Sequence, residues 1–307
     1  MNGKYYALKE IPKFKLYKKS VIFSAFNEPY ILKNLINYDF LTNIISSFQD
    51  YDNIFTITTY YEGKPLEYFK MDNITEEQIK FMSACVIQAL SYLRKKKIIH
   101  RDIMMKNIIM DKDKYFNLID FSFSIKYKNK DNNLTYLNTY DKVSPPEMLN
   151  FSIYDYNSDY YRLGSIIFFL IFKIYPSIIK KEQNISEIVI DYHIIKNYSV
   201  NCIDFMNKLL ISDYKKRIGY NNINELKKHP WFKGFDWEKL KKKEIISPFN
   251  FVSNINKKTC RRKRKSKSKI IIFKKYSNEL FYKKLMKNFD YINTKIIKSM
   301  NNFNLKF

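Results

Sequence analysis

Two polar segments near the middle of the chain carry acidic and amide side chains at a spacing that suits metal-assisted chemistry. The stretch 98–122 reads His-Arg-Asp at 100–102, then Asn107, and then Asp120 after a short apolar run. Carboxylate and amide oxygens are ligands that Mg²⁺ prefers, so Asn107 and Asp120 could hold this ion on a triphosphate. The other carboxylate, Asp102, could orient a hydroxyl nucleophile. Either segment alone recurs by chance, and the evidence lies in their order and distance.

The combined pattern, H-R-D-x-x-x-x-N followed by D-F-x, resembles the catalytic loop and the metal loop of protein kinases. The resemblance implies that Asp102 orients a substrate hydroxyl and that Asn107 and Asp120 hold Mg²⁺ while the γ-phosphate of ATP is transferred. His100 is then expected to be a packed structural residue. Arg101 would by default be a surface ion-pairing residue, and the resemblance gives it the structural role of receiving an activation-loop phosphate.

Composition excludes several other classes of protein. The chain has 307 residues, of which 46% are hydrophobic and 17% aromatic, so it is expected to be globular. The net charge of +25 is read as a solvated surface, which makes nucleic acid an unlikely partner. Three scattered cysteines (Cys85, Cys202 and Cys260) indicate reduced thiols. No signal peptide opens the sequence, and the longest apolar run, Ile166–Phe172, is far shorter than the ~20 residues of a membrane span.

A lysine near the start of the chain is the candidate phosphate ligand. The Ala7-Leu8-Lys9 sequence resembles the kinase strand whose lysine holds the α- and β-phosphates. A lysine in a strand is usually just solvated, so the argument depends on its partner. Glu28 follows 19 residues later on a helix predicted around Ser20–Leu35, which suits the lysine–glutamate ion pair of kinases.

The Gly-rich loop that covers the phosphates in kinases is missing from the sequence. No G-x-G-x-x-G occurs, and there are only five glycines. Either the sequence begins late or the protein lacks this lid. Without the strands that carry this loop, Ala7–Lys9 is expected to be an exposed edge strand of the small sheet.

The strand predicted at Ile54–Thr58 and the following Thr59–Lys64 resemble the hinge of a kinase, where backbone groups bind adenine, although an ordinary strand and turn would look the same. Thr58 would lie at the back of the nucleotide pocket. The resemblance implies that the residues around ATP are Ala7, Lys9, Thr58, Thr59, Tyr61, Ile109 and Phe289.

Two helices are expected to support the catalytic loop. Thr75–Gln78 forms a capping box before apolar residues at helical spacing. Asp159–Gly164 fits the kinase pattern D-x-W-x-x-G with tyrosine for tryptophan, and the apolar run after it predicts a helix buried all round. By resemblance, Asp159 would bond the catalytic-loop backbone. Glu147, in Pro-Pro-Glu where kinases have A-P-E, would form a structural ion pair with Arg217.

The segment between Asp120 and Glu147 corresponds to a kinase activation segment. Its Leu134–Thr139 sequence resembles the phosphorylation motif of the AGC group. By that likeness Thr135 is the activation-loop phosphosite and pairs with Arg101 when phosphorylated.

The C-terminal third also resembles AGC kinases, and in particular the catalytic domains of cyclic-AMP- or cyclic-GMP-dependent kinases. The resemblance is carried by Leu209–Phe232, Gly234–Leu240, Ile246–Phe249, Asn288–Tyr291 and the terminal Phe303–Phe307. Phe289 would lie near adenine. The basic run 257–269 could be a nuclear-localisation signal, a patch for RNA or phosphoinositide, or a solvated insertion, so the expected location is the cytoplasm or the nucleus.

Three residues depart from the pattern of an active kinase. Met104 replaces the catalytic-loop lysine that steadies the γ-phosphate. Ser122 replaces the glycine of D-F-G, and its Cβ is expected to restrict the loop that carries Asp120. Lys106 stands where an acidic residue would select arginine in substrates, so we expect no preference for Arg-rich substrates and tolerance of acidic ones.

These observations predict an α+β protein with the bilobal kinase-like fold, in which the small β lobe is truncated at its N-terminus and the large lobe is mainly helical. Residues 1–62 would form the partial small lobe, 63–232 the large lobe and 233–307 an AGC-type tail. The predicted function is a Ser/Thr protein kinase that uses ATP and Mg²⁺ and acts on protein substrates, with a regulatory subunit or an upstream kinase as further partners. The alternative is a pseudokinase, which keeps the fold as a binding module. A basic nucleic-acid-binding protein ranks below both.

Overall fold

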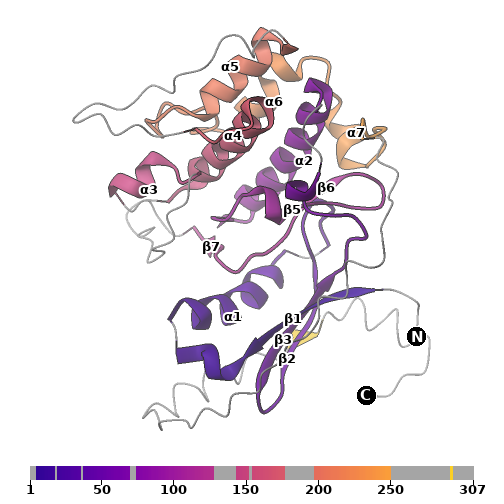
Figure 1. Ribbon diagram of the computed structural model, residues 1–307, viewed down its shortest axis with the longest axis vertical. Helices are drawn as coiled ribbons and strands as arrows, with labels where there is room; N and C mark the ends of the chain where they lie inside the picture. The colour runs from indigo at the N-terminus through magenta and orange to yellow at the C-terminus, as the bar shows by residue number, and fades with distance from the viewer. Residues whose placement is uncertain are drawn as a thin grey trace.

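The computed structural model describes residues 5–17, 19–35, 37–69, 74–127, 143–151, 154–176, 197–249 and 291–292. The predicted phosphosite Thr135, the predicted adenine contact Phe289 and the basic run 257–269 lie outside the described residues. A small part built on a sheet and a larger, mainly helical part follow one another along the long axis (Figure 1). This mixed architecture agrees with the predicted α+β class.

The small part contains an antiparallel sheet with the strand order β1-β3-β2-β8. Its strands are β1 (Tyr6–Pro12), β2 (Ile44–Gln49), β3 (Asn53–Thr59) and β8 (Tyr291–Ile292). As predicted, β1 lies at an edge of the described sheet. The sequence did not reveal β2, nor the pairing of β8 with it, which returns a segment near the end of the chain to the small sheet.

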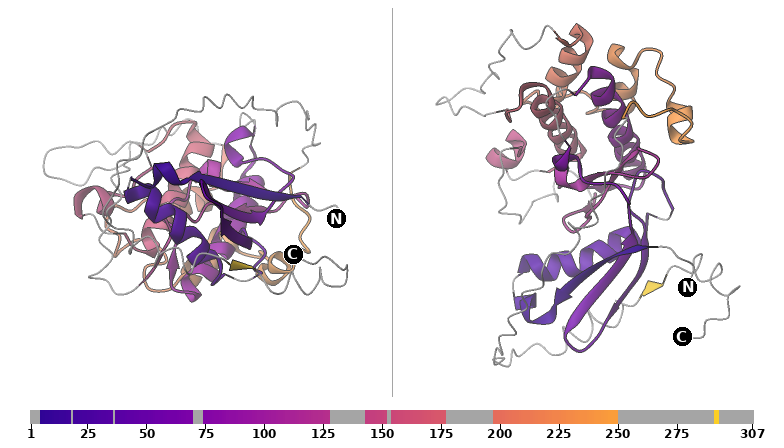
Figure 2. Two further views of the ribbon diagram at one scale, coloured as in Figure 1. Left: turned by 90° about the horizontal axis from the view of Figure 1, so that it is seen from below. Right: turned by 45° about the vertical axis from the view of Figure 1, so that its right-hand side comes forward.

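Alternation along β1 determines which side chains face the rest of the protein. Ala7, Lys9 and Ile11 are partly buried, whereas Tyr6, Leu8 and Glu10 are exposed. In register, these three inward residues pair with Thr58, Thr56 and Ile54 of β3, so all six lie on one face of the sheet. Figure 2 shows the first helix lying alongside the sheet in the small part. At the far end of this face, Ile11 and Ile54 pack with Leu16 of η1 (Lys13–Tyr17) and Ala25 of the first helix.

The helix α1 spans Lys19–Leu32 and carries Glu28. It ends three residues before the predicted Leu35, because the chain tightens into i→i+3 turns there. The Asn34 N–H donates to Ile31 O and the Leu35 N–H to Leu32 O, each at 3.0 Å.

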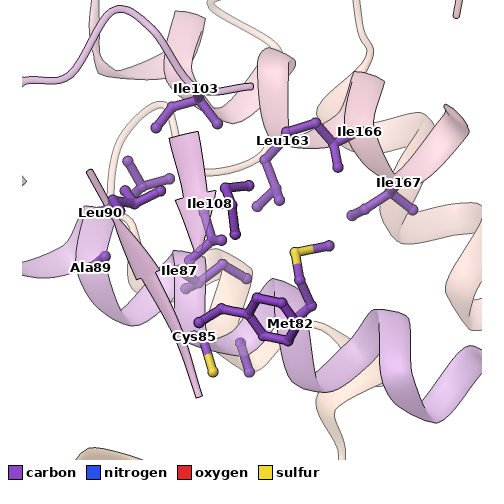
Figure 3. Close-up of a cluster of buried hydrophobic side chains, with 14 of the residues drawn as sticks. Met82, Cys85, Ile87, Ala89, Leu90, Ile103, Ile108, Leu163, Ile166 and Ile167 are labelled. Carbon is purple, nitrogen blue, oxygen red and sulfur yellow. The ribbon is translucent and has the colours of Figure 1, made fainter. Parts of the chain in front are cut away.

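The core of the large part forms where α2 (Glu76–Lys95) and α4 (Tyr156–Phe172) meet. The capping box at the start of α2 is confirmed, since Gln78 N donates to Thr75 Oγ1 at 3.2 Å and Thr75 N to Gln78 Oε1 at 3.0 Å. The helix α4 is buried on nearly every side, as predicted. Figure 3 shows side chains of α2 and α4 meeting around Ile108.

Apart from the short strands and η3 of the polar loops, the remaining described elements of this part are short helices. They are η2 (Leu66–Tyr68), α3 (Pro146–Phe151), α5 (Val200–Leu209), α6 (Asn224–Lys228), η6 (Pro230–Phe232) and α7 (Trp237–Lys241). Beyond α7, Phe249 is buried against Phe69 and Phe116. Across the described ranges, no helix is both long and apolar enough to cross a membrane.

Two small ladders hold the polar loops of the large part together. One pairs β4 (Ile98–Ile99) with β7 (Ile125–Lys126), and the other pairs β5 (Ile108–Met110) with β6 (Phe116–Leu118). Between β4 and β5 lies the loop 100–107, which ends in η3 (Met105–Asn107); between β6 and β7 lies the loop 119–124. Because both ladders are antiparallel, each of these two loops begins beside the end of the other.

Candidate active site

The loop 100–107 brings Asp102 and Asn107 into direct contact. The Asn107 amide donates to the Asp102 carbonyl oxygen at 2.9 Å and to Asp102 Oδ2 at 2.7 Å. Both residues are buried, and burial raises the pKa of Asp102 above its ordinary value. Since the NH₂ group of Asn107 faces this carboxylate, its amide oxygen points away from it and can serve another ligand.

Asp159, in the first turn of α4, holds the start of the loop 100–107 by hydrogen bonds to its backbone. Its carboxylate accepts the His100 N–H at 2.8 Å and the Arg101 N–H at 2.9 Å, which are the backbone contacts expected from the sequence. Arg101 has a φ of +70°, a conformation that is costly for a residue with a side chain. The two bonds to Asp159 help to offset that cost. Tyr154, which the sequence analysis missed, also donates to Asp159 at 3.2 Å.

The default expectation of a surface position for Arg101 is wrong. The residue is 6% exposed, and its guanidinium lies 5.6 Å from the centre of the Tyr154 ring. The left-handed backbone turns the side chain into the protein, where the aromatic face stabilises the cation. His100 is fully buried, as expected, with its ring edge-on to Phe121.

The small part supplies a lysine, Lys9 of β1, to the neighbouring loop 119–124. Lys9 Nζ lies 2.6 Å from Glu28 Oε2 and 3.2 Å from Asp120 Oδ1. The pair at positions 9 and 28 predicted from spacing is therefore present, and it extends to the loop 119–124. Burial opposes these charges, yet the Lys9 ammonium and hydrogen bonds lower the pKa of Asp120 below its ordinary value. Glu28 also accepts the Phe121 N–H at 3.1 Å, which ties α1 to this loop.

Ser122 takes part in this network. Its hydroxyl lies 2.5 Å from Lys9 Nζ and hydrogen-bonds Asp120 Oδ1 as well. The left-handed φ of this loop falls at Asp120 (+63°), and Ser122 is not among the described residues with positive φ. The Cβ of Ser122 therefore causes no left-handed strain in this conformation.

Asn27 is a further site residue that the sequence analysis missed. Its amide donates to the backbone oxygens of Ser122 (3.3 Å) and Ser124 (2.5 Å). The one sequence signal that could have found it is its place beside Glu28, on a helix already expected to face the site. Helix α1 thus holds the loop 119–124 through two neighbouring side chains.

Of the residues predicted to surround adenine, those that the structure describes lie on β1, on β3 and the segment after it, and on β5. Ala7 and Thr58 are direct neighbours across β1 and β3, on the face that carries Lys9. The Thr59 N–H donates to Asn43 O at 2.9 Å. The Tyr61 hydroxyl donates to Leu41 O at 3.0 Å. Ile109 lies in β5 on the side of the large part. Their contact with a nucleotide stays a prediction.

Glu147 and Arg217 form the ion pair expected at the base of the activation segment. Arg217 Nη1 and Nη2 lie 2.7 and 2.9 Å from the two Glu147 oxygens, and both side chains are buried. Ser158, missed from the sequence, adds a hydroxyl bond to Glu147 at 2.8 Å. Arg217 also donates to Asn157 O and Ile211 O. The pair connects α3 to α4 and to the segment after α5.

The oxygen donors of the site fit a magnesium ion. The described residues contain no group of three His, Cys, Asp or Glu side chains placed to hold a metal. Mg²⁺ is commonly held by one or two carboxylates together with substrate phosphates, and it keeps several waters. The carboxylate of Asp120 and the side-chain amide oxygen of Asn107 are donors of that kind. The Ile119 N–H donates to the backbone oxygen of Asn107 at 3.0 Å, and this hydrogen bond keeps the two loops in contact.

The small sheet carries a lysine that pairs with a glutamate on a helix. The mainly helical part carries the loop 100–107, with its Asp and Asn, and the neighbouring loop 119–124, with its Asp. Together these features are the arrangement of a protein kinase domain. Residues 1–232 match the family model of the protein kinase domain. The chain belongs to the protein kinase family, whose members use ATP and a divalent metal ion.

Several curated relatives are Ser/Thr kinases of the AGC type. The chain is 28% identical over 252 residues to serine/threonine-protein kinase sgk-1 of Caenorhabditis elegans, covering 80% of this chain and 54% of the relative. It is 30% identical over 259 residues to the cAMP-dependent protein kinase catalytic subunit of Schizosaccharomyces pombe, covering 81% of this chain and 49% of the relative. Against cAMP-dependent protein kinase type 3 of Saccharomyces cerevisiae the identity is 29% over 256 residues, covering 81% of this chain and 63% of the relative. The chain spans about half the length of most curated relatives it matches.

Proposed function

We propose that this chain is a Ser/Thr protein kinase that transfers the γ-phosphate of ATP to hydroxyl groups of proteins. The observation that carries the proposal is the convergence of two networks. Lys9, Glu28 and Asp120 meet from three separate segments, and Asp102 contacts Asn107 on the adjoining loop. Family membership alone would not require these polar groups to keep their contacts.

Each side chain has a defined task in this reaction. Asp102 orients the substrate hydroxyl and accepts its proton, and the amide of Asn107 holds that carboxylate in place. Lys9, itself held by Glu28, binds the α- and β-phosphates. Asn107 and Asp120 hold Mg²⁺, which neutralises charge on the phosphates when bound. Ala7, Thr58, Thr59, Tyr61, Ile109 and Phe289 form the proposed surroundings of adenine.

Regulation and partners follow from the same proposal. Phosphorylation of Thr135 by an upstream kinase would place a dianion where Arg101 can bind it, although Arg101 must turn from its stack on Tyr154 to do so. The relatives named as cAMP-dependent kinases support the AGC assignment, and a regulatory subunit is a proposed partner. The proposed location is the cytoplasm, with the nucleus as the alternative if the basic run 257–269 acts as a localisation signal.

A phosphoryl-transfer assay with purified protein tests the proposal. With labelled ATP, Mg²⁺ and a general protein substrate, Asp102→Asn should lower kcat by at least ~100-fold, since a positioned base contributes about that much. Lys9→Met should weaken binding of Mg·ATP, measured as a smaller thermal shift. Lys15→Met, which changes an exposed lysine in η1, is the matched control and should behave as wild type. Equal residual transfer by wild type and Asp102→Asn would refute the kinase proposal and favour the pseudokinase alternative.

A further inference from the structure

The catalytic loop lacks a lysine at position 104 but carries one two residues later. Met104 stands where the resemblance to kinases implies a cation beside the γ-phosphate, whereas Lys106 lies within η3. Lys106 Nζ is 3.9 Å from Asp102 Oδ2. Among ion pairs in the described ranges, Lys106 is the cation paired with Asp102. The carboxylate expected to orient the substrate hydroxyl therefore has a lysine beside it.

The tight turn of η3 explains how Lys106 reaches this carboxylate. Met104 is extended, with φ −155° and ψ 162°, and the Asn107 N–H then closes the turn on Met104 O at 2.9 Å. The Asn107 amide also draws the turn onto Asp102. Lys106 follows Asp102 by four positions, and the closed turn places its ammonium near the same Oδ2 atom that Asn107 contacts.

The ammonium of Lys106 is available to a ligand. Its side chain is 50% exposed, and its contact with Asp102 is longer than a hydrogen bond. Lys9, by contrast, is already engaged with Glu28, Asp120 and Ser122. An exposed cation next to the substrate-orienting carboxylate lies where negative charge develops on the transferring phosphoryl group.

We propose that Lys106 supplies the cation that the loop lacks at Met104, by contacting the γ-phosphate of ATP during transfer. This inference rests on the proposed kinase function and makes Lys106 a catalytic residue. It differs from the expectation drawn from the sequence, in which Lys106 acts on substrate choice by removing the preference for arginine and leaving acidic side chains tolerated. The two roles make different predictions for nucleotide and for peptide, so one set of variants separates them.

The test uses Lys106→Met, the conservative Lys106→Arg and the double variant Met104→Lys/Lys106→Met. Lys106→Met should lower kcat by about 100-fold, the loss typical of one charge-stabilising donor, with the KM for peptide unchanged. Lys106→Arg should stay within about threefold of wild type. The double variant should recover at least about tenfold of the loss, because it returns a cation to the position from which kinases use one. Lys112→Met, at an exposed lysine outside the site, is the control.

Binding of ATP and ADP, measured by calorimetry, tests the inference without turnover. Lys106→Met should leave the Kd for ADP unchanged and lower the preference for ATP over ADP by about threefold or more, because only ATP has a γ-phosphate. An unchanged ATP-to-ADP ratio would overturn the inference, and so would a loss confined to the KM for acidic peptides. If wild type shows Asp102-dependent transfer and Lys106→Met matches it, this inference fails while the kinase proposal stands. If no variant transfers phosphate, the kinase proposal fails and the nucleotide ratio decides the role of Lys106 in binding.

Discussion

Replacing Arg217 with methionine should destabilise the protein strongly without touching the proposed site. The guanidinium is 0% exposed and holds both oxygens of Glu147, whose side chain is 1% exposed. After Arg217→Met, Glu147 keeps the Ser158 hydroxyl bond but loses its positive partner. Breaking a buried pair from one side costs about 3–5 kcal/mol, because it leaves an uncompensated buried charge.

The expected size of this effect can be compared with an exposed ion pair in the same lobe. Lys208 and Asp204 lie 2.8 Å apart with side chains 46% and 41% exposed, so Lys208→Met should cost less than about 1 kcal/mol. For a domain of this size, each kcal/mol lowers the midpoint of thermal unfolding by about 2–4 °C. Arg217→Met should thus lower Tm by about 10 °C, and Lys208→Met by no more than a few degrees.

A double variant tests whether the buried charge is the cause. Glu147→Met/Arg217→Met removes both charges, so it should be more stable than Arg217→Met alone, although the Asn157 and Ile211 carbonyls still lose their donor. Urea unfolding followed by circular dichroism gives the free energies for the four proteins of the cycle. The reasoning is wrong if Arg217→Met costs no more than Lys208→Met, or if the double variant falls by the sum of the two single changes.

Two further predictions concern single polar side chains. Ser122→Ala removes the hydroxyl that joins Lys9 to the loop 119–124 and should lower the free energy of unfolding by about 1–2 kcal/mol in urea. Ser83→Ala should be neutral or stabilising, since that buried hydroxyl has no hydrogen-bond partner within the described structure, and an equal loss in both variants would count against a specific role for Ser122. Burial lowers the pKa of Lys227, which lies over the Trp237 ring, from 10.5 to about 8. Between pH 8 and 10.5 the unfolded chain binds a proton there that the folded chain has released, so wild type should gain stability relative to Lys227→Met as pH rises through this window. A constant difference between the two proteins across that range would contradict this.

The parts of the site that could be predicted are those with local or ordered motifs. The capping box before α2 depends on four consecutive residues, and the buried character of α4 follows from an unbroken apolar run. The positions of Asp102, Asn107 and Asp120 were recognised because their order and spacing form one pattern. The same pattern led to Lys9 and Glu28, which meet although neither has a distinctive local sequence.

The parts that could not be predicted depend on contacts between distant segments. The strand β2 has no strong alternation, and β8 pairs with it across more than half of the chain. Asn27 was missed because its partners are backbone oxygens almost a hundred residues away. The burial of Arg101 depends on one positive φ and on Tyr154, neither of which can be read from the His-Arg-Asp motif.

The sequence by itself determined the family, the order of the polar residues and the helices that carry them, because these follow from residue spacing and local periodicity. Only the tertiary structure decided what the side chains at positions 106 and 122 contact. Taken alone, the departures at positions 104, 106 and 122 indicate a weakened kinase. In the fold, Ser122 joins the network of Lys9 and Asp120, and Lys106 lies beside Asp102. The physical reason is that the charge at a site depends on where side chains end in space, which the turn at η3 and the two antiparallel ladders set together.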